Sequence, residues 1–342
     1  MNICITGGSG FIGRYFYERL RAEGHALIIL DLIDPDFDAS AARFVKGDIR
    51  DPEALRAALD GCEAVVHLAA AHHDFGIEHD TYFDVNERAS QTICDVMDEL
   101  GVKRIVFYST VAVYGDAPEP HYEDSPAEPN SPYGASKLAG EAVFRAWTGK
   151  GDGRRCLVIR PTVTFGRRNF ANMYTLISQI HRGRFLVVGR GVNIKSLSYI
   201  ENIVEATMYL WGKDDLPAFD VFNYIDKPDL TSMEITETVY EALGKGTPKL
   251  RFPMWLVLLM AVPFDLVIAL TGKNLPISSA RVKKMYSVQT KFEADKVLEA
   301  GFQPSVSLKQ GIRSMVEWYV AEGHRLSADW HQPPAEIVRF RG

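Results

Sequence analysis

Residues 2–13, NICITGGSGFIG, decide the fold of this chain. An apolar run over Asn2–Thr6 leads into a glycine loop, and an amphipathic segment over Phe11–Glu23 follows the loop. At positions 7, 10 and 13 a side chain would obstruct the tight turn, the approach of a pyrophosphate, or the packing of the helix on the strand. We therefore expect a strand–loop–helix unit that holds phosphate groups at the helix N-terminus. The residues expected there are Gly7, Gly10, Phe11, Ile12 and Gly13.

The same alternation of apolar runs and amphipathic segments continues through the first half of the chain. It is typical of a parallel sheet with helices on both faces, and uniformly apolar strands are buried on both sides. The expected fold class is α/β, a Rossmann-type doubly wound parallel sheet. The later strands are predicted at Ala26–Asp31, Ala64–Leu68, Arg104–Ser109 and Cys156–Arg160, and the later helices at Glu53–Leu59, Asn86–Leu100 and Pro132–Trp147.

After about Gly166 this rhythm loosens, and helix-like segments mix with short strands and prolines. The change indicates a smaller mixed α/β substrate-binding lobe that is partly interleaved with the sheet. We expect a dinucleotide-binding domain over 1–166, the lobe over 167–323, and a tail over 324–342 that is loosely ordered or docked on a neighbour. Helices in the lobe are predicted at Asn172–His181, Glu201–Trp211, Thr231–Leu243 and Leu308–Glu322.

Composition excludes some broad classes of protein. The chain has 342 residues and a net charge of −6, which provides no broad basic surface for nucleic acid. Its four cysteines have no CxxC spacing, which favours reduced thiols over disulfides or a zinc site, so we expect no metal. Because an apolar strand begins at residue 2 where a signal peptide would lie, we expect a cytoplasmic protein.

Three further strand ends carry residues suited to a dinucleotide. Asp31 ends the second strand, 18 residues after Gly13. Its carboxylate can accept hydrogen bonds from an adenosine ribose and would repel the 2′-phosphate of NADP, so we expect NAD as the cofactor. The contacts expected at the third and fourth strand ends are Asp48 and Ile49 at the adenine, and Leu68, Ala69 and Ala70 along the path of the cofactor.

A second constellation lies on a predicted helix, where Tyr133 and Lys137 have YxxxK spacing. Residues four apart share a helical face, so the phenol and the ammonium point the same way. A free tyrosine is a poor base at neutral pH, and we expect the lysine cation and the positive nicotinamide ring to lower the pKa of Tyr133. Ser109 and Thr110 end the fifth strand, and the Thr110 hydroxyl can hydrogen-bond a reacting oxygen.

Taken in chain order, TGGSGFIG, GDIRD, HLAA, STVAVYG and YGASK resemble the extended short-chain dehydrogenase/reductases, the NAD-dependent epimerase/dehydratase family, over about residues 1–320. The resemblance implies that Thr110, Tyr133 and Lys137 are catalytic and that Ser109, Tyr133 and Lys137 contact NAD. It also implies that Asn86 orders the active site and that Arg160–Pro161 lies beside the nicotinamide. Family members commonly pair two helices in a dimer, here Asn86–Leu100 and Pro132–Trp147, so we expect a homodimer.

The residues after Thr110 narrow the reaction. Relatives that dehydrate sugars carry Asp-Glu there, and decarboxylating relatives also carry a Glu, but this chain has Val111 and Ala112. Because these side chains cannot transfer protons, we expect hydride removal followed either by hydride return, which is epimerisation, or by net oxidation.

Four later stretches resemble the 4-epimerases of N-acetylglucosaminyl-diphospho-undecaprenol, which act on a lipid-linked sugar. The resemblance implies an NAD-dependent 4-epimerase of a diphospho-linked N-acetylhexosamine, with substrate contacts at Thr110, Arg168, Asn169, Lys195 and Arg281. Two alternatives stay open, a UDP-sugar 4-epimerase for UDP-glucose or UDP-GlcNAc and an NAD-dependent dehydrogenase of a sterol-like alcohol. The stretches are IRPTVTFGRRNFANMY (159–174), VGRGVNIKSLSYIENIVEA (188–206), FNYIDKPDL (222–230) and SSARVKKM (278–285).

One segment is unusually apolar. Met254–Leu270 reads MWLVLLMAVPFDLVIAL, with Asp265 as its single charge. It is short of the roughly 20 residues of a spanning helix. One interpretation is a buried helical pair interrupted at Pro263. The other is a surface that dips into a bilayer or holds a lipid chain, on a protein peripheral to the inner face of the plasma membrane.

Overall fold

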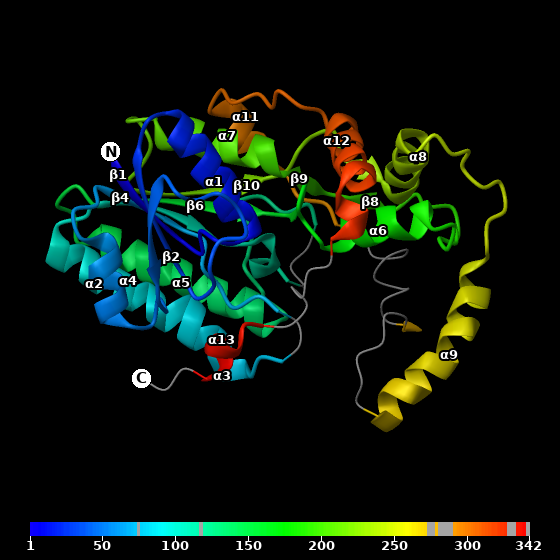
Figure 1. Cartoon of the computed structure of the whole chain (residues 1–342), viewed down its shortest axis with the longest axis horizontal. Helices are drawn as coiled ribbons and strands as arrows, with labels where there is room; N and C mark the ends of the chain where they lie inside the picture. The colour runs from blue at the N-terminus through cyan, green and yellow to red at the C-terminus, as the bar shows by residue number, and fades with distance from the viewer. Residues whose placement is uncertain (74–75, 116–118, 272–277, 280–289, 327–332, 340–342) are drawn as a thin grey trace.

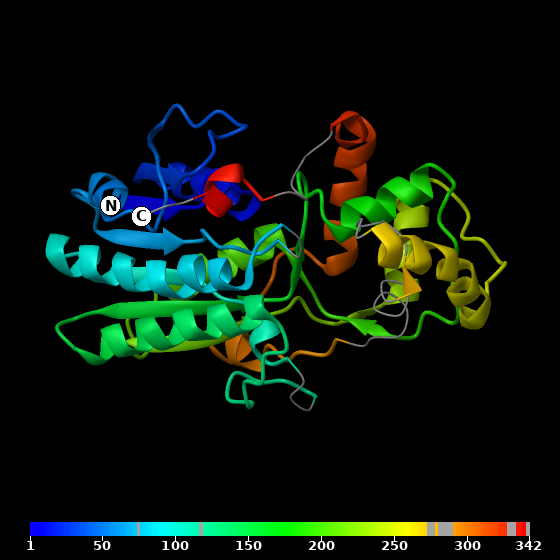
Figure 2. The same ribbon diagram turned by 90° about the horizontal axis from the view of Figure 1, so that it is seen from below.

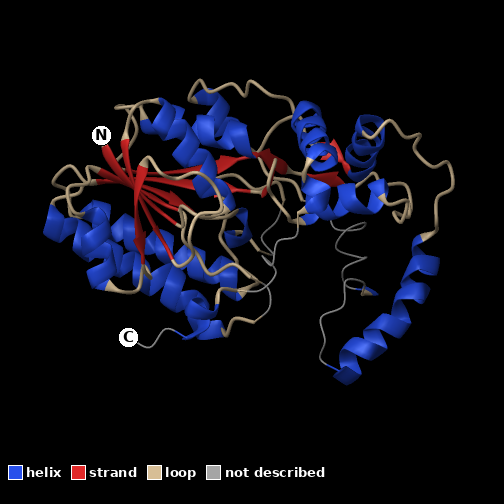
Figure 3. Cartoon of the chain, viewed as in Figure 1, coloured by secondary structure: helices blue, strands red, loops and turns tan. Residues whose placement is uncertain are grey.

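The computed structural model describes residues 1–73, 76–115, 119–271, 278–279, 290–326 and 333–339. A seven-stranded parallel sheet forms its larger part, in the order β10-β6-β5-β4-β1-β2-β3 (Figures 1 and 3). The carboxyl ends of β1 and β4 lie side by side in this order, which is where a doubly wound sheet binds its ligand. The strands are β1 (Asn2–Thr6), β2 (Ala26–Asp31), β3 (Ala42–Lys46), β4 (Ala64–His67), β5 (Arg104–Tyr108), β6 (Arg155–Pro161) and β10 (Phe219–Tyr224).

Helices cover both faces of the sheet, as predicted. Helices α1 (Phe11–Ala22) and α7 (Ile200–Trp211) pack together on one face, while α2 (Pro52–Leu59), α4 (Ala89–Leu100) and α5 (Pro132–Gly149) pack on the other. Figure 2 shows the cyan α4 and the green α5 side by side along that second face. The predicted Rossmann-type fold class is therefore confirmed. The remaining short helices on this part of the chain are α3 (His79–Phe83), η1 (Asp84–Arg88), η2 (Val111–Val113) and α11 (Asp295–Glu299).

Strand β10 is a member of the sheet that sequence reasoning does not find. It pairs in parallel with β6, from Phe219 beside Cys156 to Tyr224 beside Pro161. Strand β10 is therefore part of the sheet, and α7 packs on it, although both come from the part of the chain assigned to the lobe. The boundaries at 166 and 323 themselves stay a prediction.

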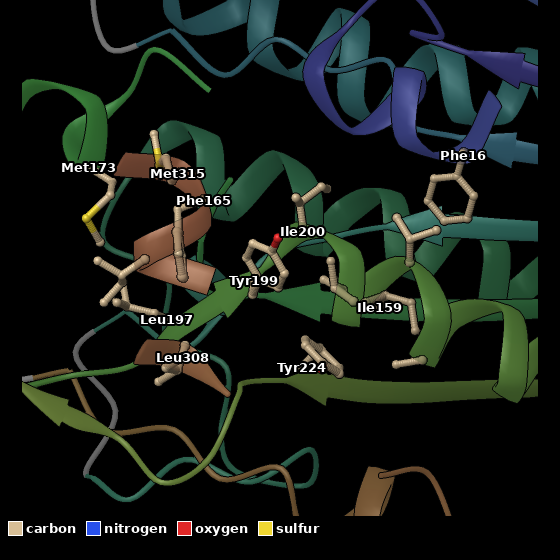
Figure 4. Close-up of a cluster of buried hydrophobic side chains, with 14 of the residues drawn as sticks. Phe16, Ile159, Phe165, Met173, Leu197, Tyr199, Ile200, Tyr224, Leu308 and Met315 are labelled. Carbon is tan, nitrogen blue, oxygen red and sulfur yellow. The ribbon is translucent and has the colours of Figure 1, made fainter. Parts of the chain in front are cut away.

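The described part of the lobe contains two small sheets and several helices. Strands β7 (Val163–Phe165) and β9 (Leu197–Tyr199) pair in parallel, and β8 (Ile194–Lys195) pairs antiparallel with β11 (Leu230–Thr231). Because β7 follows β6 after a single residue, the lobe continues directly from the strand ends of the large sheet. Figure 4 shows one apolar core that runs from Phe16 and Ile159 to Met315. The lobe's helices are α6 (Asn172–His181), α8 (Ser232–Ala242) and α12 (Leu308–Ala321), with η3 (Gly323–Arg325) after α12.

Helix α9 (Met254–Thr271) corrects one interpretation of the sequence. The segment is a single helix that continues through Pro263, not a buried helical pair. Ala261 is its one buried side chain, and Leu270 is 77% exposed. Figure 1 shows α9 standing apart from the other helices of the lobe. Among the described residues, no helix is both long and apolar enough to cross a membrane.

The described end of the tail returns to the large sheet as α13 (Ala335–Arg339). Arg50 Nη2 donates a hydrogen bond to the carbonyl oxygen of Ile337 at 3.1 Å, and the Ile337 side chain is buried. This part of the tail therefore contacts its own chain, close to the predicted adenine contact Asp48–Ile49.

Candidate active site

The loop between β1 and α1 forms a cradle that tolerates no side chains. Gly7 has a φ of +69°, and a Cβ there would lie 2.6 Å from the backbone nitrogen of Ala69. A Cβ on Gly13 would lie 2.6 Å from the Gly7 carbonyl oxygen. Gly10 is the N-cap of α1 and supplies no side-chain cap, so the first N–H groups, at Phe11 and Ile12, are available to a phosphate. The cradle fits the diphosphate of a dinucleotide.

Asp31 lies beside this loop, at the carboxyl end of β2. Its carboxylate accepts hydrogen bonds from the Ser9 N–H at 2.9 Å and from the Ile33 N–H at 3.2 Å. Burial raises the pKa of Asp31, and the backbone hydrogen bonds oppose that shift. The two amides fix the carboxylate at the rim of the cradle, where its remaining lone pairs suit ribose hydroxyls.

The other predicted cofactor contacts on β3 and β4 also lie at strand ends. The Asp48 carboxylate is bound by Arg50, whose Nη2 lies 2.6 Å from Oδ2, and the Ile49 side chain is buried. The N–H groups of Leu68 and Ala69 donate to the Thr6 carbonyl oxygen at 3.0 and 3.1 Å, and Ala70 follows them. These bonds hold the segment after β4 against the glycine loop, and its contact with a cofactor stays a prediction.

Asn86 lies in η1, a turn of π-helix directly before α4, and such turns are frequent at functional sites. Its Oδ1 accepts from the Ala71 N–H at 2.9 Å, and its Nδ2 donates to the Ala71 carbonyl oxygen at 3.0 Å and to Ser136 Oγ at 2.9 Å. Ser136 lies between Tyr133 and Lys137 on α5. The Asn86 amide therefore ties the loop after β4 to the helix that carries the candidate catalytic residues.

Thr110 and Tyr133 meet where β5 ends and α5 begins. The Thr110 side chain lies close enough to the Tyr133 hydroxyl to lower the pKa of that phenol. Thr110 also caps η2, since its Oγ1 accepts from the Ala112 N–H at 3.1 Å. A Cβ on Gly134 would lie 2.4 Å from the Ala112 carbonyl oxygen, so only glycine lets α5 approach η2 this closely. The two predicted catalytic hydroxyls are thus brought together.

The pKa values of Tyr133 and Lys137 are both shifted by burial. Burial raises the pKa of Tyr133 to about 12, and the hydrogen bond from Thr110 opposes that shift. Burial lowers the pKa of Lys137 to about 7, and the nearby Glu141 charge opposes it. In the chain alone, burial therefore dominates the pKa of Tyr133, and the lowering expected from Lys137 together with a nicotinamide ring stays a prediction. Desolvation penalises the charged forms of both side chains.

A buried ionic network behind Lys137 escapes the sequence analysis. Arg160 donates to both carboxylate oxygens of Glu141, with Nε to Oε1 at 2.9 Å and Nη2 to Oε2 at 2.7 Å. Ser109 Oγ donates to Glu141 Oε1 at 2.5 Å, and Arg160 Nη1 donates to the Tyr114 hydroxyl at 2.8 Å. Glu141 could have been found, because it follows Lys137 by four residues on the same helical face. The Arg160 guanidinium lies in this network, and its contact with a nicotinamide stays a prediction, as does that of Pro161.

The predicted substrate residues other than Thr110 do not form one cluster. Arg168 and Asn169 follow β7, and Arg168 pairs with Glu322 at 3.6 Å. Lys195 precedes the paired part of β9, so the parallel register of β7 and β9 places it toward the opposite end of that small sheet. Arg281 lies outside the described residues. The roles of these four residues stay predictions.

A doubly wound sheet with YxxxK on the helix after β5 is the arrangement of the short-chain dehydrogenase/reductases, here of the extended type with a substrate lobe. The chain belongs to the NAD dependent epimerase/dehydratase family, whose model matches residues 3–223. Membership confirms the predicted family, an enzymatic function and NAD as the cofactor.

Individual proteins in the comparisons show which members of this family the chain is similar to. The chain is 38% identical over 318 residues to the N-acetyl-alpha-D-glucosaminyl-diphospho-ditrans,octacis-undecaprenol 4-epimerase of Escherichia coli O157:H7, covering 93% of this chain and 95% of that protein. It is 24% identical to a 3beta-hydroxysteroid-dehydrogenase/decarboxylase of Arabidopsis thaliana, covering 92% of this chain and 61% of that one. The UDP-glucose 4-epimerase of Thermotoga maritima, solved with UDP-glucose, matches with a TM-score of 0.73 at 23% identity, covering 94% of this chain and 99% of that one. At that identity the likeness supports the fold alone.

Proposed function

We propose that this protein is an NAD-dependent 4-epimerase of a lipid-linked, diphospho-bound N-acetylhexosamine that interconverts the GlcNAc and GalNAc forms. The observation that carries the proposal is the proximity of Thr110 to Tyr133, with Lys137 one helical turn further along α5, in a chain 38% identical over nearly its whole length to an enzyme named for that reaction. Val111 and Ala112 support it, because they supply no acid or base for elimination at neighbouring carbons.

The residues present fit NAD, since the glycine cradle would hold its diphosphate and Asp31 its ribose. A bound NAD would supply reversible hydride transfer at the sugar C4, with removal from one face and return to the other. Tyr133 removes the proton of the C4 hydroxyl in the first half and returns it in the second. Thr110 hydrogen-bonds the same oxygen, and Lys137 favours the ionised phenol. The strand end and the helix hold these groups in register, which supplies orientation in advance.

The test is product analysis with purified protein. Polyprenyl-diphospho-GlcNAc, UDP-GlcNAc and UDP-glucose are incubated separately with the NAD-loaded enzyme, and the stereoisomers are identified. We expect 4-epimerisation of the lipid-linked sugar without net NADH. Turnover confined to the UDP-sugars would contradict the proposed carrier. Stoichiometric formation of NADH with a sterol alcohol would instead support the dehydrogenase alternative. The distant Arabidopsis relative and the exposed apolar helix α9 favour that alternative.

We also propose that α9 docks on the bilayer that holds this substrate. Trp255, Leu259 and Leu266 are 67%, 61% and 60% exposed. Burying ~200 Å² of such surface at about 25 cal/mol per Å² is worth about 5 kcal/mol, which suffices for reversible attachment. Lys249 and Arg251 lie exposed directly before the helix and suit anionic headgroups.

Vesicle flotation tests the docking of α9. The chain should float with vesicles of phosphatidylethanolamine and phosphatidylglycerol, and the triple variant W255S/L259S/L266S should lose most of that binding. The matched control is I33S/V320S, which removes exposed apolar side chains away from α9. Unchanged flotation of the triple variant would contradict the proposal. If no vesicle binding occurs and the variant turns a dimer into a monomer, a second copy of the chain covers α9 instead.

The expected homodimer would use α4 and α5. Small side chains, Ala142 and Ala146, are exposed on α5, and Gln91 and Asp95 are exposed on the neighbouring α4. Small residues allow two helix pairs to approach closely. We expect A142R/A146R to shift the mass measured by light scattering from dimer to monomer. Ala57→Arg, which alters an exposed alanine on α2, is the control. A monomeric wild-type chain would contradict this part of the proposal.

A further inference from the structure

The network behind Lys137 contains more charge than a buried site ordinarily holds. Lys137, Glu141 and Arg160 are 1%, 4% and 6% exposed. Lys137 and Glu141 lie one helical turn apart on α5, and side chains with that spacing are neighbours. In a poorly solvated interior, opposite charges at that spacing attract strongly, so a contact pair between them is the arrangement to expect.

The structure does not show that pair. Both carboxylate oxygens of Glu141 accept from Arg160, and Oε1 also accepts from Ser109. A bidentate guanidinium fixes the plane of a carboxylate as well as its charge, so Glu141 faces β6. The Lys137 ammonium lies over the Phe107 ring, 4.1 Å from its centroid. An aromatic face stabilises a cation without withdrawing its charge from other partners.

We propose that Arg160 is a positioning residue that occupies Glu141 and so keeps the Lys137 cation available to Tyr133. Without Arg160, the Glu141 carboxylate would be buried with only the Ser109 hydroxyl, and it would close on Lys137. A lysine held in that pair turns away from the phenol, and Tyr133 ionises less readily. The inference rests on the proposed roles of Tyr133 and Lys137, but not on which sugar is the substrate.

Other titratable groups also face this network, and the variants compared in the test below leave these groups unchanged. The His67 ring stacks on Phe107, and the positive charge of Lys137 helps burial to lower the pKa of His67. Tyr114 is held by Arg160, and burial raises its pKa. The groups facing Lys137, Glu141 and Arg160 from the neighbouring elements are His67 on β4, Tyr114 after η2, Glu123 in the following loop and Cys156 on β6.

The experiment titrates Tyr133 directly in the NAD-loaded enzyme. The ultraviolet absorbance of phenolate is followed against pH, and subtraction of the matching Tyr133→Phe protein isolates this one side chain. We expect Arg160→Met to raise the apparent pKa of Tyr133 by about one unit or more. The double variant R160M/E141M should return it most of the way, because the carboxylate that captures Lys137 is then absent. If Arg160 had only a structural role, removing Glu141 as well would not return the pKa of Tyr133 toward the wild-type value.

Arg145→Met is the matched control, since Arg145 lies one turn beyond Glu141 on α5 but is exposed and stacks on Phe219. It should leave the Tyr133 titration unchanged. If Arg160→Met does not fold, Arg160→Lys keeps a buried cation without the guanidinium fork, and it should shift the titration in the same direction by less. The proposal is overturned if a folded Arg160 variant titrates like wild type, or if R160M/E141M stays at the single-variant value. Because no sugar is present, failure of epimerisation would not produce either result.

Discussion

Gly7→Ala should disable the cofactor cradle by a steric clash, and the effect of this clash can be measured separately from backbone strain. At a φ of +69°, an alanine costs about 1 to 2 kcal/mol by conformation alone. The new Cβ would also lie 2.6 Å from the Ala69 nitrogen and 2.8 Å from the Ala69 Cα. Relieving that overlap costs about 1 to 3 kcal/mol more, because backbone must move. Since the contacted atoms are backbone, Ala69→Gly in the same chain should not rescue the loss.

Gly101→Ala is the control, because Gly101 has a φ of +73° but no atom within 4 Å of the added Cβ. Urea unfolding at equilibrium gives the free energy of unfolding for each variant. We expect Gly7→Ala to lose about 1 to 3 kcal/mol more than Gly101→Ala. It should also lose the thermal stabilisation by added NAD, which Gly101→Ala should keep. Equal losses in the two variants, with NAD binding intact in both, would refute the steric account of the cradle.

Three further predictions follow from the same structure. Tyr133→Phe should bind NAD and stay folded, while its kcat falls by ~10²-fold or more; Tyr122→Phe, at an exposed tyrosine, should keep wild-type kcat. Because burial lowers the pKa of Lys137 to about 7, the folded chain releases a proton above that pH while the unfolded chain still binds it. The free energy of unfolding should therefore rise with pH from about 7 toward 10. Lys137→Met should reduce this slope, measured by urea unfolding, by up to about 1.4 kcal/mol per pH unit. Asp226→Asn should cost about 1 to 3 kcal/mol, because the amide nitrogen that replaces the buried Oδ2 cannot accept the hydrogen bond from the Tyr199 N–H, whereas Asp214→Asn at the surface should change stability little.

The elements around the cofactor could be predicted closely because sequence pattern and burial agree there. Predicted Asn2–Thr6 and Asn172–His181 coincide with β1 and α6. Strand β10 could not be found in the same way. Asp220 and Asn223 interrupt its apolar pattern, and Asn223 is buried through a hydrogen bond from the Tyr114 hydroxyl at 2.7 Å. A strand that buries polar groups on distant partners carries no local signal of its own.

In the candidate site too, sequence spacing predicts local neighbours but not contacts between distant parts of the chain. The spacing of Tyr133 and Lys137 predicts that they share a helical face, and the structure adds Thr110 beside the phenol. Spacing does not predict the pKa values, because those depend on how completely the side chains are desolvated and on which charge is near. Nor does it predict Arg160 on Glu141, since the two residues are 19 positions apart and meet only when β6 lies beneath α5.

Residue type and burial disagree both in the network of Lys137, Glu141 and Arg160 and along α9. Lys137, Glu141 and Arg160 are buried although isolated charges in an interior are very unfavourable, and each finds its compensation within the chain. Along α9 the departure is reversed, because Trp255 and Leu270 are exposed although apolar surface favours burial. No described part of the chain covers those two side chains, so the partner must be sought elsewhere. The proposed docking of α9 on a bilayer would account for this exposed apolar surface.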